Sequence, residues 1–372
     1  MVPRHIYVHV PFCARRCSYC DFSIAVRRVV PVDEFLATLS RELALRVPGG
    51  ERWPIDTLYI GGGTPSQLGP DGVARLMELL HARFELARGA EVTLEANPDD
   101  ITGDAIRAWR AAGVNRLSIG SQSFDPRVLA WMHRTHSAEQ IGAAVAIARD
   151  GGIPSLSLDL IFAVPDELAR DWERDVVQAV ALGPQHLSLY GLTVEPATPL
   201  GRWRARGLVD EAPEERYASE FLLAHQLLAQ AGYEHYEVSN YALPGHRSRH
   251  NSSYWRRVPY AGFGPSAHSF DGASRRWNLS PYAGWVRSLE KGRDPVEGDE
   301  VLTRDSRCSE EVYLGLRVAD GMDVDATMAL RVQPWIDAGW AVLDGVRLRL
   351  TPEGWLRLDA LAADLTLVAS YC

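Results

Sequence analysis

Short runs rich in β-branched and aromatic residues alternate with longer amphipathic segments through the first half of the chain. This alternation restricts the possible folds more than any other feature of the sequence. Strands are expected at residues 6–10, 57–60, 91–96, 115–120, 155–162 and 186–192. Helices are expected at residues 33–47, 71–84, 104–113, 138–152 and 166–183, where apolar residues recur at helical spacing. This order predicts a parallel sheet with right-handed crossovers. An open doubly wound sheet and a partial barrel both fit, and in both folds functional side chains lie at the carboxyl ends of the strands.

The regular alternation ends near residue 215, which divides the chain into three predicted parts. Residues 1–215 are expected to form the α/β domain. Residues 216–300 form an extension, with a Gly-, Pro- and aromatic-rich stretch of little periodicity at 236–270. Residues 301–372 contain two helical segments, a hairpin about Asp344-Gly345 and a last helix. That order predicts a small helical, winged-helix-like domain.

Composition and charge exclude several classes of protein. The chain has 372 residues and a formal net charge of −9, without a cluster of basic residues, which argues against a nucleic-acid partner. No apolar stretch reaches the length of a membrane span, and MVPRHIYVHV lacks the apolar core of a signal peptide. Five cysteines, three of them crowded, do not make a disulfide framework. We therefore expect a cytoplasmic protein without a membrane span.

The crowded cysteines, Cys13, Cys17 and Cys20, lie in the stretch CARRCSYC, directly after the first expected strand. Three neighbouring thiolates repel one another unless a cation binds them, and zinc and iron–sulfur clusters are the usual cations. A structural zinc site needs a fourth ligand, which His9 or His5 could supply. A [4Fe–4S] cluster held by three cysteines keeps one iron free for a small chelating molecule. The spacing favours the cluster, and zinc remains the alternative.

Polar or glycine-rich loops follow the next strands. The run GGGTPS at residues 61–66 lets the backbone approach a ligand closely, and it lacks the Gly-Lys-Ser/Thr ending of a phosphate-binding loop. Glu95, Gln122 and Asp159 lie at the ends of the third, fourth and fifth strands. An amide and a carboxylate can form hydrogen bonds with the hydroxyl groups of a ligand. Each of these residues could also be an ordinary solvated or salt-bridged side chain.

The pattern CxxxCxxC, with an aromatic residue before the third cysteine, resembles the signature of the radical S-adenosylmethionine (SAM) superfamily. The GGGTP and TLEANP stretches extend the resemblance. It implies that the free iron of a [4Fe–4S] cluster chelates the amino and carboxylate groups of SAM. An electron then splits SAM into methionine and a 5′-deoxyadenosyl radical, which abstracts a hydrogen atom from the substrate.

The resemblance also implies a role for each matching residue. Cys13, Cys17 and Cys20 would hold the cluster. The backbone carbonyls of the glycine-rich loop would bind the SAM amino group, Glu95 its amino-acid moiety, and Arg134 its carboxylate, while Gln122 and Asp159 would bind the ribose. Tyr7 would lie beside the cluster, with ordinary packing in its strand as the alternative, and Tyr19 is the aromatic residue of the cysteine signature. The residues that the resemblance adds to those already named are Tyr7, Tyr19, Gly62, Gly63, Thr64 and Arg134.

Within the superfamily, the motifs YVHVPFC, LDLIF, YEVSNYA and HNSSYW resemble the coproporphyrinogen III oxidase-like branch. That branch contains an oxygen-independent dehydrogenase, which converts two propionates of coproporphyrinogen III to vinyl groups, and the haem chaperones named HemW. The resemblance is greater to HemW, because Phe22 stands where the dehydrogenase has a further cysteine and only twelve residues precede Cys13.

The HNSSYW stretch is also the one implicated in haem binding by HemW. His250 is chemically suited to ligate haem iron, and Tyr254 and Trp255 could pack on a porphyrin face. Anchoring of a loop to the barrel is the alternative role of this motif. The implied partners are SAM, haem or a porphyrinogen, an electron donor and a haem-accepting protein.

One loop departs from the pattern of the branch. Its members have a Gly-Leu-Pro-Gly-like run after the strand that carries Asp159, and this chain has AVPDE at residues 163–167. A different loop shape is therefore expected beside Asp159.

Overall fold

The computed structural model describes residues 2–47, 49–50 and 52–367. Its main sheet has the strand order β14-β13-β12-β11-β1-β4-β5-β6-β7-β8-β10-β9. The six expected strands lie side by side at its centre and run parallel. They are β1 (His5–Val10), β4 (Trp53–Gly62), β5 (Phe84–Ala96), β6 (Arg116–Gln122), β7 (Ser155–Phe162) and β8 (His186–Gly191). The predicted alternation of strands and helices is confirmed.

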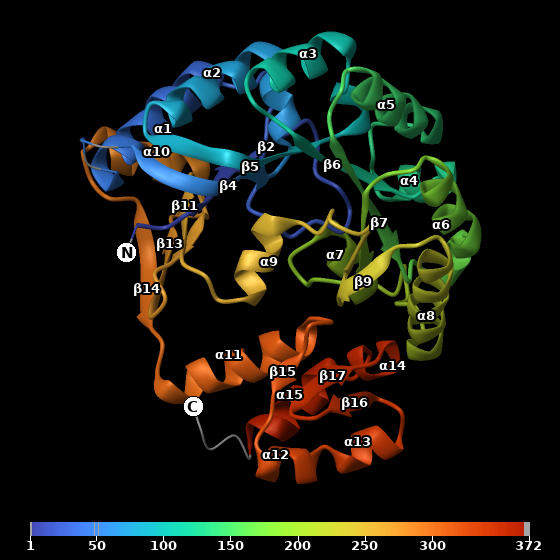
Figure 1. Cartoon of the computed structure of the whole chain (residues 1–372). Coiled ribbons are helices and arrows are strands. Elements are labelled where there is room, and N and C mark those ends of the chain that lie inside the picture. Colours follow the sequence, from blue (N-terminus) through green and yellow to red (C-terminus); the bar gives the residue numbers. More distant parts are fainter. Residues whose placement is uncertain (1, 48, 51, 368–372) are drawn as a thin grey trace.

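Helices cover the outer side of the curved sheet, as Figure 1 shows. They are α1 (Val32–Arg46), α2 (Gly69–His81), α3 (Gly103–Ala111), α4 (Pro126–Trp131), α5 (Ala138–Asp150), α6 (Trp172–Ala181) and α8 (Glu214–Gln230). Their apolar faces bury Phe35, Leu76, Ile106 and Val176 against the sheet. Helix α6 begins at Trp172, later than expected, because Asp171 accepts a hydrogen bond from the Arg174 N–H and caps the helix there.

The stretch without periodicity forms short elements at both sides of the parallel strands. Strands β9 (Glu234–Glu237) and β10 (Asn240–Ala242) extend the sheet beyond β8. On the other side β11 (Tyr260–Phe263) pairs with β1, and β12 (His268–Phe270), β13 (Ser274–Asn278) and β14 (Val296–Val301) follow. Helices α9 (Arg249–Trp255) and α10 (Tyr282–Glu290) connect them. Strands of three to six residues are too short to give a period in the sequence.

The C-terminal part has the expected order of helix, helix, hairpin and helix. Its helices are α11 (Arg304–Arg317), α12 (Ala326–Arg331), α13 (Gln333–Asp337), α14 (Pro352–Trp355) and α15 (Leu358–Thr366). Its strands are β15 (Met322–Asp323), β16 (Ala341–Asp344) and β17 (Arg347–Leu350), with β17 in the middle. The partial (β/α)6 barrel with a C-terminal helical, winged-helix-like domain is thus confirmed. The boundaries at residues 215 and 300 stay predictions.

The C-terminal part packs against the barrel at β9 and α9, below the sheet in Figure 1. Arg317 of α11 forms an ion pair of 2.8 Å with the fully buried Glu237 of β9. Trp355 donates a hydrogen bond to the Leu316 carbonyl and its ring meets His235 edge-on. Across the described residues, no helix combines the length and apolar character required for a membrane crossing.

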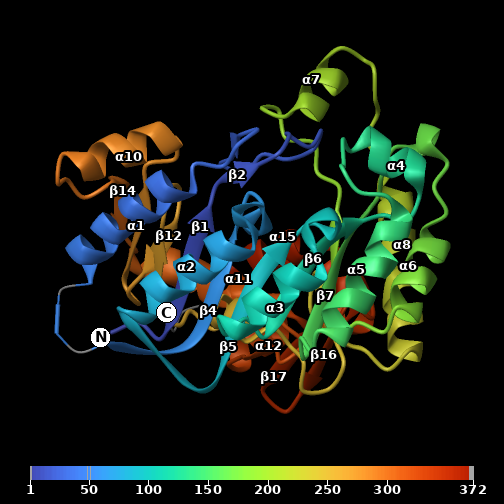
Figure 2. The same ribbon diagram turned by 90° about the horizontal axis from the view of Figure 1, so that it is seen from above.

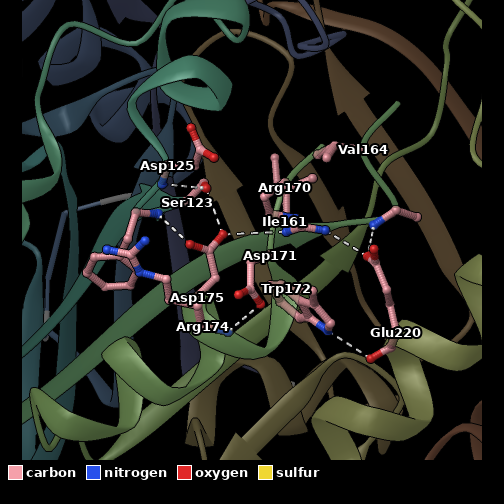
Figure 3. Close-up of polar contacts among 12 residues, drawn as sticks. Ser123, Asp125, Ile161, Val164, Arg170, Asp171, Trp172, Arg174, Asp175 and Glu220 are labelled. Carbon is pink, nitrogen blue, oxygen red and sulfur yellow. Dashed lines mark hydrogen bonds and ion pairs between the residues drawn. The ribbon is translucent and has the colours of Figure 1, made fainter. Parts of the chain in front are cut away.

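A buried charge cluster fixes the loop after β7 (Figure 3). The Arg170 side chain is fully buried, 2.7 Å from Glu220 and 3.5 Å from Asp175. Glu220 accepts a hydrogen bond of 2.7 Å from the Ala163 N–H, and Asp175 accepts one of 2.6 Å from Ser123. Ala163 has a left-handed backbone, with φ 57°. The AVPDE loop is therefore held in its own shape by α6 and α8.

Candidate functional site

A cavity of about 470 Å³ lies at the carboxyl ends of the parallel strands. It brings together nearly all the residues that the sequence pattern singled out. The wall includes Cys13, Cys17, Tyr19, Cys20, Gly62, Gly63, Thr64, Glu95, Gln122, Arg134 and Asp159. We call it the first cavity. Tyr7 and His250 are outside its wall.

The cysteine loop is held by one strand pair of its own and by bonds to two other parts of the fold. Within the loop, β2 (Phe12–Cys13) pairs with β3 (Ala25–Val26). The Ser18 N–H donates to the Met132 carbonyl, and the Ser18 carbonyl accepts from Leu200 at the start of α7 (Pro199–Ala205). Figure 2 shows α7 and β2 on the same side of the barrel. These bonds present the loop to the ends of the strands.

Two of the three sulfur atoms already accept weak hydrogen bonds from the cavity wall. Thr64 donates to Cys13 and Arg134 donates to Cys17, each at 3.4 Å. Burial raises the pKa of Cys13, and it raises the pKa of Cys20 to about 11. These thiols therefore stay protonated unless a cation balances the thiolate charge, as a bound metal centre does. Three thiols on one wall suit an iron–sulfur cluster that is held at three irons.

The glycine-rich loop after β4 lies too close to its neighbours for side chains. A Cβ atom on Gly62 would approach the His9 ring to 2.7 Å, and one on Gly63 would approach the Pro11 carbonyl oxygen to 2.7 Å. The N–H groups of Gly62, Gly63 and Thr64 donate to Glu95, Val10 and Phe12. With its donors used, this loop can offer a ligand only its carbonyl oxygens. That polarity suits an amino group.

Glu95 is half-buried at the end of β5 and faces the first cavity. Its carboxylate accepts hydrogen bonds from the Tyr59 hydroxyl at 2.8 Å and the Gly62 N–H at 2.9 Å. Burial raises the pKa of Glu95 to about 7, and the nearby Asp159 carboxylate adds to the rise. A carboxyl group with this pKa changes charge near neutral pH when an amino group binds to it.

The next two strand ends supply the predicted amide and carboxylate. Asp159 accepts hydrogen bonds from Ser118 at 3.0 Å and Ser157 at 3.4 Å, and burial raises its pKa. Gln122 has a left-handed backbone, with φ 66°, beside an irregularity in the pairing of β6 with β7. Strained backbone of this kind is common at binding sites. Ser118, which periodicity did not single out, also lies on the wall.

Arg134 connects the cysteine loop to two strand ends. Besides Cys17, its guanidinium donates to the Asn97 side chain at 2.6 Å and the Gly120 carbonyl at 2.9 Å. Its Nε atom is buried without a hydrogen-bond partner. A buried cation with an unused donor suits a carboxylate ligand. Asn97, in the ANPD stretch, holds this side chain and was missed in the sequence because nothing marks it as a contact to Arg134.

A second cavity, of about 620 Å³, lies next to the first. The two cavities share Asp21, Phe22, Gly62 and Glu95 in their walls. Tyr7, expected beside the cluster, lines the second cavity, and its hydroxyl lies 3.1 Å from Nδ1 of His9. Tyr254 and Trp255 of the HNSSYW stretch line this cavity too, whereas Asn251 lines the first.

His250 is buried, and neither cavity includes it in its wall. Its Nδ1 is 2.7 Å from the Thr57 hydroxyl and its Nε2 is 2.7 Å from the Tyr254 hydroxyl. Burial lowers the pKa of His250 to about 3. With both ring nitrogens engaged, the side chain has no atom to offer iron in this structure. The geometry matches the alternative role of anchoring a loop, and iron ligation by His250 stays a prediction.

The histidines considered for a zinc site are also engaged elsewhere. Nδ1 of His9 faces Tyr7 and its Nε2 lies 2.9 Å from the Ser23 carbonyl oxygen. Nδ1 of His5 lies 2.9 Å from the Thr57 hydroxyl. Neither histidine lies in the wall that carries the cysteines. The donor set around the cysteines is therefore three thiols, which fits the cluster better than a closed zinc site.

Known proteins resemble the chain over almost its whole length. The sequence profile of the radical SAM superfamily matches residues 7–178, and that of the HemN C-terminal domain matches residues 302–357. The heme chaperone HemW of Mycobacterium tuberculosis is 37% identical over 369 residues, which cover 98% of this chain and 95% of the relative. The heme chaperone HemW of Escherichia coli is 40% identical over 267 residues, covering 72% and 70%.

A solved structure shows the same fold. The coproporphyrinogen III oxidase HemN of Escherichia coli superposes with a TM-score of 0.83 and 24% identity, covering 98% of this chain and 90% of that one. At this identity the likeness concerns the fold alone. The extent of the likeness to the HemW proteins, together with the superfamily profile over the cysteine-bearing half, establishes that the chain belongs to the HemW family of radical SAM proteins.

Proposed function

We propose that this protein is a haem chaperone, which binds haem and passes it to an acceptor protein, and that it holds a [4Fe–4S] cluster and SAM in the first cavity. The observation that carries the proposal is the meeting of three cysteines with the polar ends of four strands in one cavity of a HemW family member. Relatives similar over most of the chain are named heme chaperones, which supports haem as the cargo. When bound, the cluster and SAM would supply one-electron cleavage of the sulfonium.

In this proposal different residues of the first cavity bind the [4Fe–4S] cluster and SAM. Cys13, Cys17 and Cys20 ligate the cluster. Arg134 binds the SAM carboxylate through its unused Nε, and Glu95 with the carbonyls of the glycine-rich loop binds the amino group. The ribose hydroxyls bind to Asp159 and Gln122. A cytoplasmic location, an electron donor and a haem-accepting protein belong to the same proposal.

The proposed function is tested with anaerobically reconstituted protein. We expect the protein to bind one haem, seen as a shifted Soret band, and to transfer it to an apo-haem protein. In a parallel assay with coproporphyrinogen III, SAM and a reductant, we expect no vinyl product. Formation of that product at a steady rate, or absence of haem binding, would contradict the proposal.

The pKa of Glu95 gives a prediction for the pH dependence of SAM binding. The carboxylate form accepts hydrogen bonds from the SAM amino group better than the neutral acid does, so binding favours loss of the proton. SAM affinity should therefore rise with pH below about 7, by at most about tenfold per unit, and level off above that value. Equilibrium binding between pH 5.5 and 8.5 measures it.

Two variants on β5 control that experiment. Glu95→Gln removes the titrating group, so the affinity should be lower and nearly independent of pH over this range. Glu85→Gln changes an exposed carboxylate on the same strand and should behave like the unmodified protein. An unchanged pH dependence in Glu95→Gln would assign the titration to another group.

A further inference from the structure

The wall of the second cavity carries six Phe, Tyr or Trp side chains among its sixteen residues, and it comes from parts of the chain that are distant in sequence. The cysteine loop, α9, β11, β12 and α11 each contribute to it. Its aromatic and aliphatic side chains are Tyr7, Phe22, Tyr254, Trp255, Tyr260, Phe270 and Leu314. At about 620 Å³ the cavity is within the size range of ligand and cofactor sites. Such a wall suits a large, flat, apolar molecule.

Several groups on this wall lack the partners that buried or aromatic groups normally have. Phe22 is 63% exposed although it lies between the two cavities. Nε1 of Trp255 and Nε of Arg257 are buried without a hydrogen-bond partner. Buried donors are nearly always satisfied in folded proteins. An occupant of the cavity would cover the Phe22 ring, and anionic acceptors on it would suit the donors beside that ring.

Two cations lie at the end of the cavity near α11. Arg257 and Arg275 both line the wall and both face carboxylates. Nε of Arg257 lies 3.7 Å from Glu310 and its Nη1 lies 3.5 Å from Glu311, while Arg275 pairs with Glu310 directly and lies 3.6 Å from Glu300. Arg275 also lies over the Phe270 ring, at 5.6 Å from its centroid. Guanidinium groups bind carboxylates with paired hydrogen bonds. Two of them beside an aromatic wall suit an aromatic molecule that carries two carboxylates at one edge.

Three histidines lie in or near the wall, and only one can offer a nitrogen to a metal. His9 and His250 use both ring nitrogens in hydrogen bonds. His268 is exposed to the cavity, and its ring nitrogens make no hydrogen bond within the part of the chain that the structure describes. Its ring stacks on Trp277, with centroids 5.8 Å apart. Partial burial and the charge of Arg275 lower its pKa, so at neutral pH the imidazole is uncharged, the form that ligates metals.

We infer that the second cavity is the haem site, in which His268 ligates the iron, Arg257 and Arg275 bind the two propionates, and Phe22 and Tyr254 contact the ring. The inference rests on the proposed function, since it assigns a place to the haem of that proposal. It adds that the iron ligand is His268, outside the HNSSYW stretch. It also places the haem beside the SAM site, because Glu95 and Gly62 belong to both walls.

The test is titration of the anaerobically reconstituted full chain with ferric haem, followed by absorption and electron paramagnetic resonance spectroscopy. The unmodified protein should show the spectrum of histidine-ligated haem. His268→Gly should lose that spectrum and bind haem about tenfold more weakly or worse, and free imidazole should restore the spectrum. His81→Ala is the matched control, because His81 ends α2 outside both cavities. It should bind haem as the unmodified protein does.

A double variant tests the propionate contacts independently of the iron. Arg257→Gln with Arg275→Gln should weaken haem binding yet keep the histidine-ligated spectrum, and it should barely change binding of an iron porphyrin whose propionates are esterified. Far-ultraviolet circular dichroism and SAM binding show that each variant is folded.

The possible failures are distinguishable. If the unmodified protein binds no haem, the proposed function fails and the inference fails with it. If it binds haem and His268→Gly keeps both the affinity and the histidine-ligated spectrum, the inference alone is overturned. Loss of that spectrum in His250→Ala, with His268→Gly unchanged, would assign the iron to the HNSSYW stretch.

Discussion

Replacing Cys17 by alanine is expected to leave the reconstituted protein without its iron–sulfur cluster. The iron content should fall from about four atoms per chain to almost none. The cluster needs three cysteine ligands, and the variant has only two. SAM affinity should fall more than about 100-fold. Loss of a cluster ligand weakens the site more than loss of a residue that only orients a ligand. Iron and sulfide analysis, absorption spectroscopy and SAM binding measure these losses.

Ser18→Ala is the matched control for the cysteine variant. Ser18 is fully buried in the same loop, and its hydroxyl has no hydrogen-bond partner, while its backbone N–H and carbonyl hold the loop in place. Removing the hydroxyl should leave iron content and SAM binding unchanged. A Cys17→Ala protein that kept a full cluster would show that Cys17 is not a ligand.

Replacing Arg170 by alanine is expected to lower the free energy of unfolding by about 3–5 kcal/mol. The side chain is fully buried. Its loss leaves Asp175 without its cation and leaves Glu220 with only Arg216, at 3.9 Å. Burial already raises the pKa of Asp175, which means that its charged form is disfavoured there. Loss of the cation disfavours that charged form further. Chemical denaturation followed by circular dichroism measures the change.

Two comparisons isolate the buried charge as the cause. Arg174→Ala changes an exposed arginine in the first turn of α6. Its backbone N–H, which the substitution keeps, donates to Asp171, so the change should cost less than about 0.5 kcal/mol. Arg170→Met combined with Asp175→Asn and Glu220→Gln should recover part of the loss, since no charge stays buried alone. A loss below about 1 kcal/mol in Arg170→Ala would mean that water reaches the cluster.

The parallel strands and the first cavity could be predicted because each depends on local signals. A buried strand is recognised in the sequence by its run of apolar residues. The parallel topology then brings the residues that follow each strand to the same edge of the sheet. Cys13, Gly62 and Glu95 therefore meet although 82 positions separate the first from the last. The left-handed backbone of Gln122 carried no such signal, because it arises where the pairing of β6 and β7 shifts.

The second cavity could not be predicted, since its wall depends on contacts between parts of the chain without a common period. Phe22, Tyr254, His268 and Leu314 meet only after the short strands have extended the sheet and α11 has packed beneath it. The place of His250 shows the same limit. Its chemistry suits a metal, but tertiary packing turned both ring nitrogens toward Thr57 and Tyr254.

The ends of the main sheet have a consequence for how the chain behaves in crowded solution. A sheet that does not close on itself exposes unpaired backbone groups, which invite strands of other molecules. At one end, β14 has the sequence VEGDEV, whose three carboxylates repel a second copy of the same strand. At the other end, β9 is occupied by residues 317–319, which bond to Tyr236 and Val238. The chain thus keeps an accessible interior without becoming a template for its own polymerisation.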